Sequence, residues 1–376
     1  MSAWPGKYVI GLTGNIATGK SVVRKMLEHL GAYGIDADAL AHRAIAPGSP
    51  GYKPVVEMFG KWIVADDGQI DRARLAKIVF NDAEALHLLE QIIHPLVEQA
   101  VDLFIRRSKH KVVVIEAIKL LEGNLSKRCD QVWVTYTPEE VQLQRLLQKR
   151  GMTEEAARGR IAAQSPQEEK VARANQVITN SGSFEDTWQK VYTAWLEIFP
   201  EEAEAAPEQA TGVGELVVQR ARPRQSNEIA RFMRDQSKGM RKFTASDIMA
   251  AFGEKAFLLL KNKDEICGLV GWKVENLVAC ADDIYLDRQI PFLDGIRFLI
   301  EEVERASKEL QCEISLLFLQ PDFSHQEPLL NQLGYHQRTI QSLEVHAWED
   351  AALEGSQPGY LMFFKQLRKD RVLRPV

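Results

Sequence analysis

Residues 14–21 read Gly14-Asn15-Ile16-Ala17-Thr18-Gly19-Lys20-Ser21 and meet every fixed position of the pattern G-x-x-x-x-G-K-[ST]. In this pattern a glycine-rich loop cradles the phosphates of a nucleotide. The two glycines can adopt backbone angles closed to other residues, so that the N–H groups of the loop can face a polyphosphate. Lys20 is expected to reach the β- and γ-phosphates, and the Ser21 hydroxyl to hold Mg²⁺. The stretch therefore predicts a site for a polyphosphate with its magnesium.

The sequence on either side fits the strand, loop and helix that a phosphate loop requires. The apolar stretch Tyr8–Thr13 has the composition of a buried parallel strand. Residues 22–30 carry apolar side chains at helical spacing, with charged side chains between them. The alternative is an ordinary glycine-rich turn, and the order of the three elements favours the phosphate site.

Composition indicates a globular protein of a reducing compartment. The 376 residues suffice for two domains, and the net charge of −5 gives no support to broad nucleic-acid binding. No apolar run is long enough to cross a bilayer, and the N-terminus lacks the apolar centre of a signal peptide. The four cysteines lack C-x-x-C spacing, which predicts neither a zinc site nor a disulfide framework. We expect a cytoplasmic protein that acts on small molecules, without nucleic acid or membrane as partners, and the sequence does not indicate an oligomeric state.

An acidic stretch of small residues divides the chain. Residues 200–214 are nearly free of large apolar side chains, which predicts a linker between a domain of residues 1–199 and a domain of residues 215–376.

Apolar and amphipathic segments alternate in the first domain. Short apolar stretches at 112–115 and 132–135 are interpreted as strands, and the segments at 86–107 and 139–150 as helices. Such alternation predicts an α/β fold, a parallel sheet with helices on both faces.

Two aspartates, Asp36 and Asp38, follow the predicted first helix. In a right-handed βαβ unit this segment ends a strand near the first one, so its carboxylates would face the phosphate loop at the carboxyl edge of the sheet. Phosphoryl transfer needs a group that orients or deprotonates the accepting hydroxyl, and an aspartate can do so. Spacing alone leaves open an alternative in which Asp38 is the N-cap of the next helix.

Further motifs follow the phosphate loop in a characteristic order. They are Asp36-Ala37-Asp38, Phe59-Gly60, Gly68-Gln69-Ile70-Asp71-Arg72, Leu89-Glu90-Gln91-Ile92-Ile93-His94-Pro95, Arg160-Ile161-Ala162-Ala163-Gln164 and Asn180-Ser181-Gly182. Through their joint order, the region from Tyr8 to about Val191 resembles dephospho-coenzyme A kinase. The resemblance implies a P-loop kinase fold with a helical substrate-gripping region and a mobile lid. It also implies transfer of the γ-phosphate of ATP, with Mg²⁺, to the ribose 3′-hydroxyl of dephospho-CoA, the last step of coenzyme A synthesis.

The resemblance implies roles for individual residues. Asp38 would be the base or orienter of the acceptor hydroxyl. Arg72 and His94 would contact the acceptor nucleotide. Arg145, at the base of the lid, would meet the transferring phosphoryl group, and Asn180 would border the adenine.

Each of these roles has a structural alternative. Arg72 could lie on a solvated helix face, and His94 could be a core histidine beside a proline at a helix N-terminus. Asn180 could be an ordinary turn residue. The lid is expected around Gly151, and solvated helix faces are the alternative for most of its basic residues. These are Arg145, Lys149, Arg150, Arg158 and Arg160.

The sequence departs from the family at a few positions. The family usually has a glycine where Asn15 stands and a threonine where Val22 stands, and neither is a fixed position of the phosphate-loop pattern. It also commonly has a proline before paired apolar residues at the point where this chain has Ile118 and Lys119. This second departure bears on the fit of the acceptor.

The second domain has its own order of elements, which resembles the GNAT acetyltransferase fold, an α+β fold. That family binds the pyrophosphate of CoA on a glycine-rich turn before the central helix. Here the corresponding residues 287–295 lack the two spaced glycines, and Pro291 has no N–H to donate. We expect a GNAT-like domain without ordinary acetyl-CoA binding, in which His325 and His336 are structural residues rather than bases.

Three functions are compatible with these patterns. The first is an ATP-dependent dephospho-CoA kinase with a GNAT-like appendage. The second is a P-loop kinase for another nucleoside or nucleotide, an alternative raised by Ile118 and Lys119. The third is a regulatory protein whose first domain only senses nucleotide. The presence of Lys20 and Asp38 favours catalysis.

Overall fold

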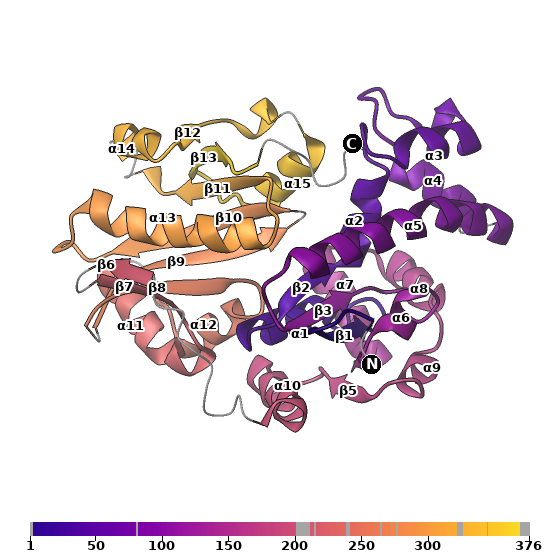
Figure 1. Cartoon of the computed structure of the whole chain (residues 1–376), viewed down its shortest axis with the longest axis horizontal. Coiled ribbons are helices and arrows are strands. Elements are labelled where there is room, and N and C mark those ends of the chain that lie inside the picture. The colour runs from indigo at the N-terminus through magenta and orange to yellow at the C-terminus, as the bar shows by residue number, and fades with distance from the viewer. Residues whose placement is uncertain are drawn as a thin grey trace. The chain divides into compact units, whose positions relative to one another are not determined.

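The computed structural model describes residues 3–79, 82–200, 211–213, 216–237, 241–263, 265–275, 277–321, 326–343 and 345–368. The chain divides into two compact units (Figure 1). Unit 1 holds Met1–Lys20 and Ala32–Ser181, and unit 2 holds Ser21–Gly31 and Gly182–Lys369. In the described part of the chain, no helix combines the length and apolar character needed to span a bilayer.

Unit 1 is built on the parallel sheet that the alternating pattern predicts. Its strands lie in the order β2-β3-β1-β4-β5, and every neighbouring pair is parallel. They are β1 (Tyr8–Thr13), β2 (Tyr33–Asp36), β3 (Val112–Glu116), β4 (Gln131–Tyr136) and β5 (Gln176–Thr179). Because all five run the same way, the segments that follow them meet at one edge of the sheet.

Helices connect and flank these strands. They are α2 (Ala37–Ala44), α3 (Tyr52–Phe59), α4 (Arg72–Val79), α5 (Ala83–Arg107), α6 (Leu125–Arg128), α7 (Glu139–Arg150), α8 (Glu154–Ala162) and α9 (Gln167–Val171). Contacts join α2 to β3, α6 to β1 and α9 to β4. The two helices predicted at 86–107 and 139–150 are confirmed as α5 and α7.

A helical region stands beside the sheet of unit 1. In Figure 1, α3 and α4 lie along the long helix α5. Apolar side chains from these helices, from the short 3₁₀ helix Lys61–Ile63 and from the loops between them form a separate core cluster. Its buried members are Ile45, Val55, Ile63, Ile70, Leu75, Val79, Ala85 and Leu89. This cluster fixes the helices that surround the pocket described below.

Unit 2 contains a mixed sheet of eight strands in the order β12-β13-β11-β10-β9-β8-β7-β6. They are β6 (Thr211–Val213), β7 (Leu216–Arg220), β8 (Ala256–Asn262), β9 (Glu265–Glu275), β10 (Val278–Leu286), β11 (Ile314–Leu319), β12 (His336–Gln337) and β13 (Leu361–Gln366). Among the strand pairs of the described residues in this sheet, β10 and β11 alone are parallel. The helices are α1 (Lys20–His29), α10 (Phe184–Ile198), α11 (Ser226–Gln236), α12 (Ala245–Ala251), α13 (Phe292–Glu309), α14 (Glu327–Gln332) and α15 (His346–Gly355), with short 3₁₀ helices at Pro223–Gln225 and Ile340–Ser342.

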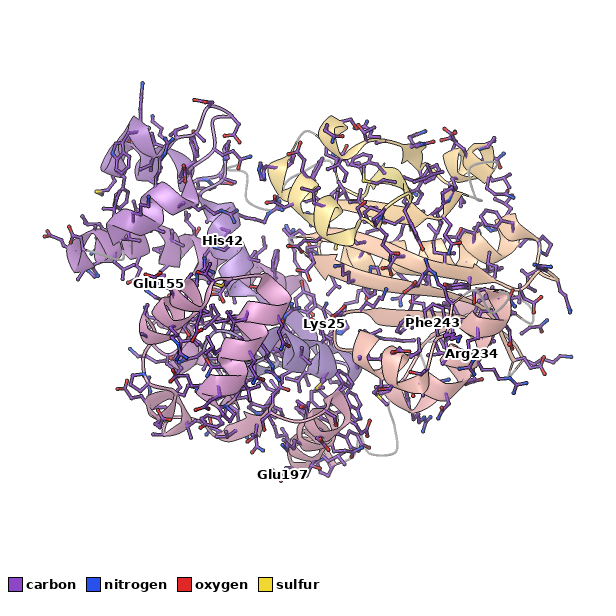
Figure 2. All side chains as sticks on the ribbon, turned by 180° about the vertical axis from the view of Figure 1, so that it is seen from behind. Lys25, His42, Glu155, Glu197, Arg234 and Phe243 are labelled. Carbon is purple, nitrogen blue, oxygen red and sulfur yellow. The ribbon has the colours of Figure 1, made fainter. Side chains whose placement is uncertain are left out.

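Alternate residues of the unit 2 strands enter different cores, as strand geometry requires. Leu258 and Leu260 of β8 pack in the cluster that includes α13, whereas Phe257 and Leu259 pack in the cluster that includes α11 and α12. The Arg234 guanidinium of α11 also donates to the carbonyl of Phe243, at 2.6 Å from Nη1, just before α12 (both residues are labelled in Figure 2).

The structure refines the sequence reading of unit 2. The apolar stretches at 256–260 and 267–272 flank a polar segment, a pattern that predicts a hairpin. This prediction is confirmed, because β8 and β9 pair antiparallel. Thr211–Val213, inside the range 200–214 that was expected to be a linker, form β6 and pair with β7. Residues 201–210 and 214 of that range lie outside the described residues. Helix α15 and strand β13 lie beyond residue 345, where the sequence pattern gave no element.

Candidate active site

The phosphate loop needs its two glycines for both backbone angle and space. Gly14 has φ +152° and Gly19 has φ +87°. A Cβ atom on Gly14 would lie 2.2 Å from Thr135 Oγ1, and one on Gly19 would lie 1.9 Å from Asn180 Nδ2. Both positions are therefore restricted to glycine.

Residues at the carboxyl ends of β4 and β5 form hydrogen bonds that hold this loop in place. The Asn180 side chain donates to the Thr18 carbonyl at 2.9 Å, and the Thr137 hydroxyl donates to the Asn180 carbonyl at 2.9 Å. The hydroxyls of Thr18 and Thr135 are 2.7 Å apart. Asn180 is thus more than a turn residue, since it ties the carboxyl end of β5 to the phosphate loop.

Arg145 joins the same group from α7. Its Nη1 donates to the Ala17 carbonyl at 3.0 Å, and its Nη2 donates to the Asn180 carbonyl at 2.9 Å. Partial burial lowers the pKa of Arg145, but guanidinium stays charged at any physiological pH. The structure therefore holds a cation against the loop that is predicted to bind phosphates.

The other basic residues of the expected lid behave differently. The Arg158 guanidinium is exposed and pairs with Glu154, at 2.8 Å, on the surface of α8. Arg160 is also exposed, and the side chains of Lys149 and Arg150 lie outside the described residues. Among these basic residues whose side chains the structure describes, Arg145 is the one that contacts the phosphate loop.

Lys20 closes the loop as a buried ammonium beside carboxylates. Its residue is 8% exposed, and Nζ donates to the Asn15 carbonyl at 3.3 Å. Burial lowers the pKa of Lys20, whereas the charges of Glu116 and Asp38 act to raise it. Ser21, the second residue of α1, is exposed.

The structure separates the roles of the two aspartates. Asp36 is the N-cap of α2 and accepts from the Ala39 N–H at 2.8 Å. Asp38 is the second residue of α2, so the alternative in which Asp38 is the cap is wrong. The Asp38 carboxylate instead accepts from the Ile118 N–H, at 3.1 and 3.3 Å to its two oxygens.

Asp38 titrates in an unusual range. Burial and the charge of Asp36 raise the pKa of Asp38 to about 6, although Lys20 and the Ile118 N–H favour the charged form. A carboxyl with this pKa is largely ionised near neutral pH and more basic than an ordinary aspartate. These two properties suit a general base.

A pocket of about 390 Å³ opens beside Asp38, a volume within the range of small-molecule sites. Apolar residues of the helical region form most of its wall, among them Leu75, Val79, Leu89 and Ile93. Its polar lining comprises Asp38, His42, Arg72, Glu90, His94, Glu98, Lys119 and Asn124. The pocket thus brings Asp38 together with Arg72 and His94, the residues implied to contact the acceptor.

The polar lining of the pocket carries charges of both signs. Burial and the charge of Arg72 lower the pKa of His42, which is labelled in Figure 2. Lys119 Nζ forms an ion pair with Glu90 Oε1 at 2.6 Å. His94 lies with Pro95 inside the long helix α5, so the alternative of a proline at a helix N-terminus is wrong.

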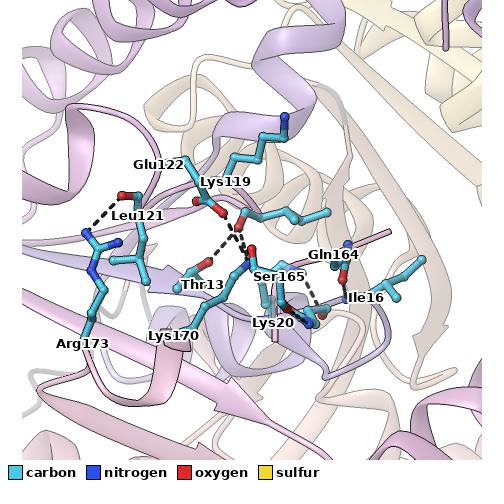
Figure 3. Close-up of polar contacts among 12 residues, drawn as sticks. Thr13, Ile16, Lys20, Lys119, Leu121, Glu122, Gln164, Ser165, Lys170 and Arg173 are labelled. Carbon is cyan, nitrogen blue, oxygen red and sulfur yellow. Dashed lines mark hydrogen bonds and ion pairs between the residues drawn. The ribbon is translucent and has the colours of Figure 1, made fainter. Parts of the chain in front are cut away.

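Several residues of this site carry no signal in the sequence pattern. They are Thr135, Thr137, Lys170 and His42. Thr135 lies near the end of β4 and Thr137 directly follows that strand, whose end could have drawn attention because parallel strands end at the ligand edge. Lys170 lies in the polar segment Gln167–Val171, which is typical of a solvated helix, yet it is buried (Figure 3).

The start of α13 in unit 2 lacks the features of a pyrophosphate site. Pro291 is the N-cap, no side chain caps the helix, and Asp294 lies in the first turn. A Cβ on Gly295 would lie 2.9 Å from Leu286 Cδ2, so this glycine packs against an apolar side chain. His336 is exposed on β12 beside Asn331, and His325 lies outside the described residues.

The residues around the phosphate loop are compatible with Mg²⁺ that arrives with a nucleotide. In the described ranges, no three His, Cys, Asp or Glu side chains are grouped to hold a metal ion. The hydroxyl oxygen of Ser21, a donor type that Mg²⁺ accepts, is exposed.

Comparison with known proteins identifies the family. A model of the dephospho-CoA kinase family matches residues 8–186. The dephospho-CoA kinase of Carboxydothermus hydrogenoformans is 45% identical over 188 residues, which cover 49% of this chain and 91% of that protein. The dephospho-CoA kinase of Geobacter sulfurreducens is 42% identical over 195 residues, which cover 51% of this chain and 99% of that protein. A GNAT-family acetyltransferase structure from Staphylococcus aureus aligns with a TM-score of 0.34 and 12% identity over 41% of this chain and 99% of that one. Because these two kinases match over at least nine-tenths of their own length, the chain belongs to the dephospho-CoA kinase family.

Proposed function

We propose that the protein transfers the γ-phosphate of ATP to the ribose 3′-hydroxyl of dephospho-CoA, giving CoA and ADP. The observation that carries this proposal is the position of Asp38. Its carboxylate lines the pocket beside the helical region and also lies in the electrostatic field of Lys20 of the phosphate loop. The Asp38 carboxylate therefore lies between a pocket that could hold the acceptor and the loop that could hold the phosphates of ATP.

On the donor side, the proposal assigns the phosphates of ATP to the loop Gly14, Asn15, Ile16, Ala17, Thr18, Gly19, Lys20 and Ser21. Lys20 would contact the β- and γ-phosphates, and Asn180 would border the adenine. Arg145, anchored on the Ala17 and Asn180 carbonyls, would face the transferring group. Ser21 would hold the Mg²⁺ of the nucleotide, and that ion, when bound, would neutralise charge on the phosphates.

On the acceptor side, the pocket offers an apolar wall to a planar base and cations to a pyrophosphate. Leu75, Val79 and Leu89 would pack against the adenine ring. Arg72 and Lys119 would meet the phosphates of the acceptor, and His94 would add a polar contact.

In the transfer step, the 3′-oxygen attacks the γ-phosphorus while the bond from that phosphorus to ADP breaks. Asp38 accepts the proton of the hydroxyl, and the raised pKa of Asp38 makes it a better acceptor than an ordinary carboxylate. The buried ammonium of Lys20 and the guanidinium of Arg145 stabilise negative charge on the transferring group.

The direct test is turnover of the purified full chain with ATP, Mg²⁺ and dephospho-CoA. ADP and CoA should form in equal amounts, and the Lys20→Ala variant should reduce the rate to background. Lys119 at the pocket gives a specific reason to compare acceptors, so AMP and CMP belong in the same assay. Turnover of either at a higher kcat/KM than dephospho-CoA would replace the proposed acceptor, and a wild-type rate equal to that of Lys20→Ala would refute kinase function.

A further inference from the structure

One short segment of unit 1 contacts both the phosphate loop and the loop that holds Asp38. We name residues 164–173, between α8 and β5, the bridging segment. At its first end, the Asn15 side chain donates to the Ser165 carbonyl at 2.9 Å, and the Ile16 N–H donates to Gln164 Oε1 at 2.7 Å. At its other end, Lys170 Nζ donates to the Ile118 carbonyl at 2.9 Å (Figure 3). The segment thus links the two halves of the proposed site.

Lys170 is the buried member of this segment. It is 4% exposed, and its nearest carboxylate oxygen, Glu122 Oε1, is 3.9 Å away. Burial lowers the pKa of Lys170, whereas the charges of Glu122 and Asp38 act to raise it. A buried ammonium is costly unless it is well paired, yet the closest contact of this one is to a peptide carbonyl. The hydrogen bond from Lys170 to the Ile118 carbonyl therefore explains the position of this ammonium better than an ion pair does.

The peptide groups of Ile118 connect Lys170 to Asp38. The Ile118 carbonyl accepts from Lys170 and from the Thr13 hydroxyl, the latter at 3.1 Å. The Ile118 N–H donates to the Asp38 carboxylate. The two groups belong to successive peptide units that meet at the Ile118 Cα, so hydrogen bonds that fix one planar unit also restrain the orientation of the other. An ammonium on the carbonyl side fixes this turn of the backbone and orients the donor that holds Asp38.

Lys170 also contributes to the charge balance around the proposed base. The carboxylates of Asp36 and Glu116 and the ammonium of Lys20 face Asp38. The charge of Lys170 acts on Lys20 and is itself influenced by Asp38. Two buried cations therefore stand among three carboxylates where the phosphoryl group is proposed to move.

We propose that Lys170 is a positioning residue for phosphoryl transfer. Through the two peptide units that meet at Ile118 it holds the Asp38 carboxylate toward the acceptor pocket, while the bridging segment fixes the phosphate loop at the same time. The kinetic consequence of this inference rests on the proposed function. The effect of Lys170 on the Asp38 carboxylate, however, can be measured in the substrate-free protein.

The test compares Lys170→Met, Lys170→Gln and Lys170→Arg with wild type. Lys170→Gln keeps an N–H donor and removes the charge, and Lys170→Arg keeps both. The matched control is Arg173→Met. Arg173 is an exposed member of the same segment, and its Nη2 donates to the Leu121 carbonyl at 3.1 Å in the same loop as Ile118. Thermal unfolding of every variant checks that it is folded.

Two measurements are made on these proteins. Lys170→Met and Lys170→Gln should lower kcat about 10- to 100-fold with KM for ATP nearly unchanged. They should also move the acid limb of the pH–rate profile to higher pH, because loss of a nearby cation favours protonated Asp38. Lys170→Arg should restore both, and Arg173→Met should leave the acid limb in place. Independently, ¹³C NMR of the carboxyl groups should record the same upward shift of the Asp38 titration without substrate.

An Asp38 titration that is identical in wild type, Lys170→Met and Lys170→Gln would overturn the proposal. A fall in kcat in Arg173→Met as large as that in Lys170→Met would also overturn it. That result would mean that Lys170, like Arg173, only helps to anchor the loop that contains Ile118 and Leu121. Failure of the proposed function is distinguishable, because it would appear as absent wild-type turnover while the NMR titration still responds to Lys170.

Discussion

The backbone N–H of Ile118 points at the carboxylate of Asp38, at 3.1 and 3.3 Å from its two oxygens. The two residues are far apart in the sequence, and they meet because the strands β2 and β3 that precede them are parallel neighbours. This contact fixes the Asp38 carboxylate. Among the residues described for the pocket and the phosphate loop, it is the one carboxylate that lines the acceptor pocket and also acts to raise the pKa of Lys20.

Replacing Asp38 with Asn should abolish most turnover. Loss of a positioned general base lowers kcat by about 10²- to 10⁴-fold, and the Asn side chain can still accept from the Ile118 N–H. In wild type, the deprotonated form of Asp38 is required, so kcat/KM should rise with pH through about 6, the pKa of Asp38. Steady-state kinetics of both proteins between pH 5 and 8 measures this. A wild-type profile that is flat across this range would contradict the role.

The same substitution should stabilise the fold near neutral pH. Because the pKa of Asp38 is raised in the folded state, the stability contributed by its protonated form is present below the unfolded pKa and is lost as pH rises through about 6. Asp38→Asn removes the buried charge and should increase the free energy of unfolding at pH 7.5 by on the order of 1–2 kcal/mol. Urea unfolding at pH 5 and 7.5 measures the difference, which should shrink at the lower pH.

Asp36→Asn is the matched control for this pair of measurements. Asparagine is an equally good N-cap, so α2 should keep its start. The charge of Asp36 is one cause of the raised pKa of Asp38, so its removal should move the acid limb to lower pH while kcat at pH 8 stays within about twofold. A loss of activity as large as that of Asp38→Asn would mean that the roles of the two aspartates have been confused.

Gly19→Ala should damage nucleotide binding. Gly19 has φ +87°, and the new Cβ would lie 1.9 Å from Asn180 Nδ2, which itself holds the Thr18 carbonyl. The backbone angle alone costs about 1–2 kcal/mol, and displacing Asn180 distorts the loop further. We expect KM for ATP to rise at least about tenfold. Gly159→Ala in α8, where nothing lies within 4 Å of the added atom, should leave kinetics unchanged and is the control.

The pair Lys119 and Glu90 should tune acceptor binding without supporting the fold. Their side chains are 47% and 28% exposed, so their coupling in a double-mutant cycle of stability should be below about 1 kcal/mol. Lys119→Leu should raise KM for dephospho-CoA about three- to thirtyfold, because a cation at the pocket is lost. Glu90→Gln should lower the same KM, because it releases the Lys119 ammonium from its partner. An unchanged KM in both variants would remove Lys119 from the acceptor site.

The phosphate loop, the parallel sheet and the pair Asp36 and Asp38 could be predicted because each leaves a local mark on the sequence, whereas a site role for Asn180 was implied only by the resemblance. Gly14 and Gly19 indicate positions with a positive φ angle, and the apolar stretches Tyr8–Thr13 and Val112–Glu116 indicate buried parallel strands. The carboxyl edge of such a sheet then points to Asp36 and Asp38 as a pair. What spacing could not decide was which of the two caps α2, because both positions suit a helix start and the choice depends on the partner Ile118 from another strand.

Lys170 and His42 could not be found in this way, because their role depends on distant parts of the chain. Lys170 stands among polar residues in a short helix, and only the approach of the Ile118 loop buries it. His42 resembles any polar residue of an amphipathic helix until Arg72 is placed nearby. In unit 2, β13 was missed because a single short apolar stretch near a chain end does not indicate a strand until β11 pairs with it.

The start of α13 predicts that the full chain does not transfer acetyl groups from acetyl-CoA. Pro291 supplies no N–H at the N-cap, and the side chains of Leu286 and Ile290 lie close to Gly295. Asp294 places a negative charge in the first turn, where it already complements the positive end of the helix dipole and would repel a pyrophosphate. Release of free thiol from acetyl-CoA, measured with a panel of amines, should stay at the buffer rate in wild type and in Lys20→Ala. Sustained release that persists in Lys20→Ala, where the phosphate loop is disabled, would instead place a working acetyltransferase in unit 2.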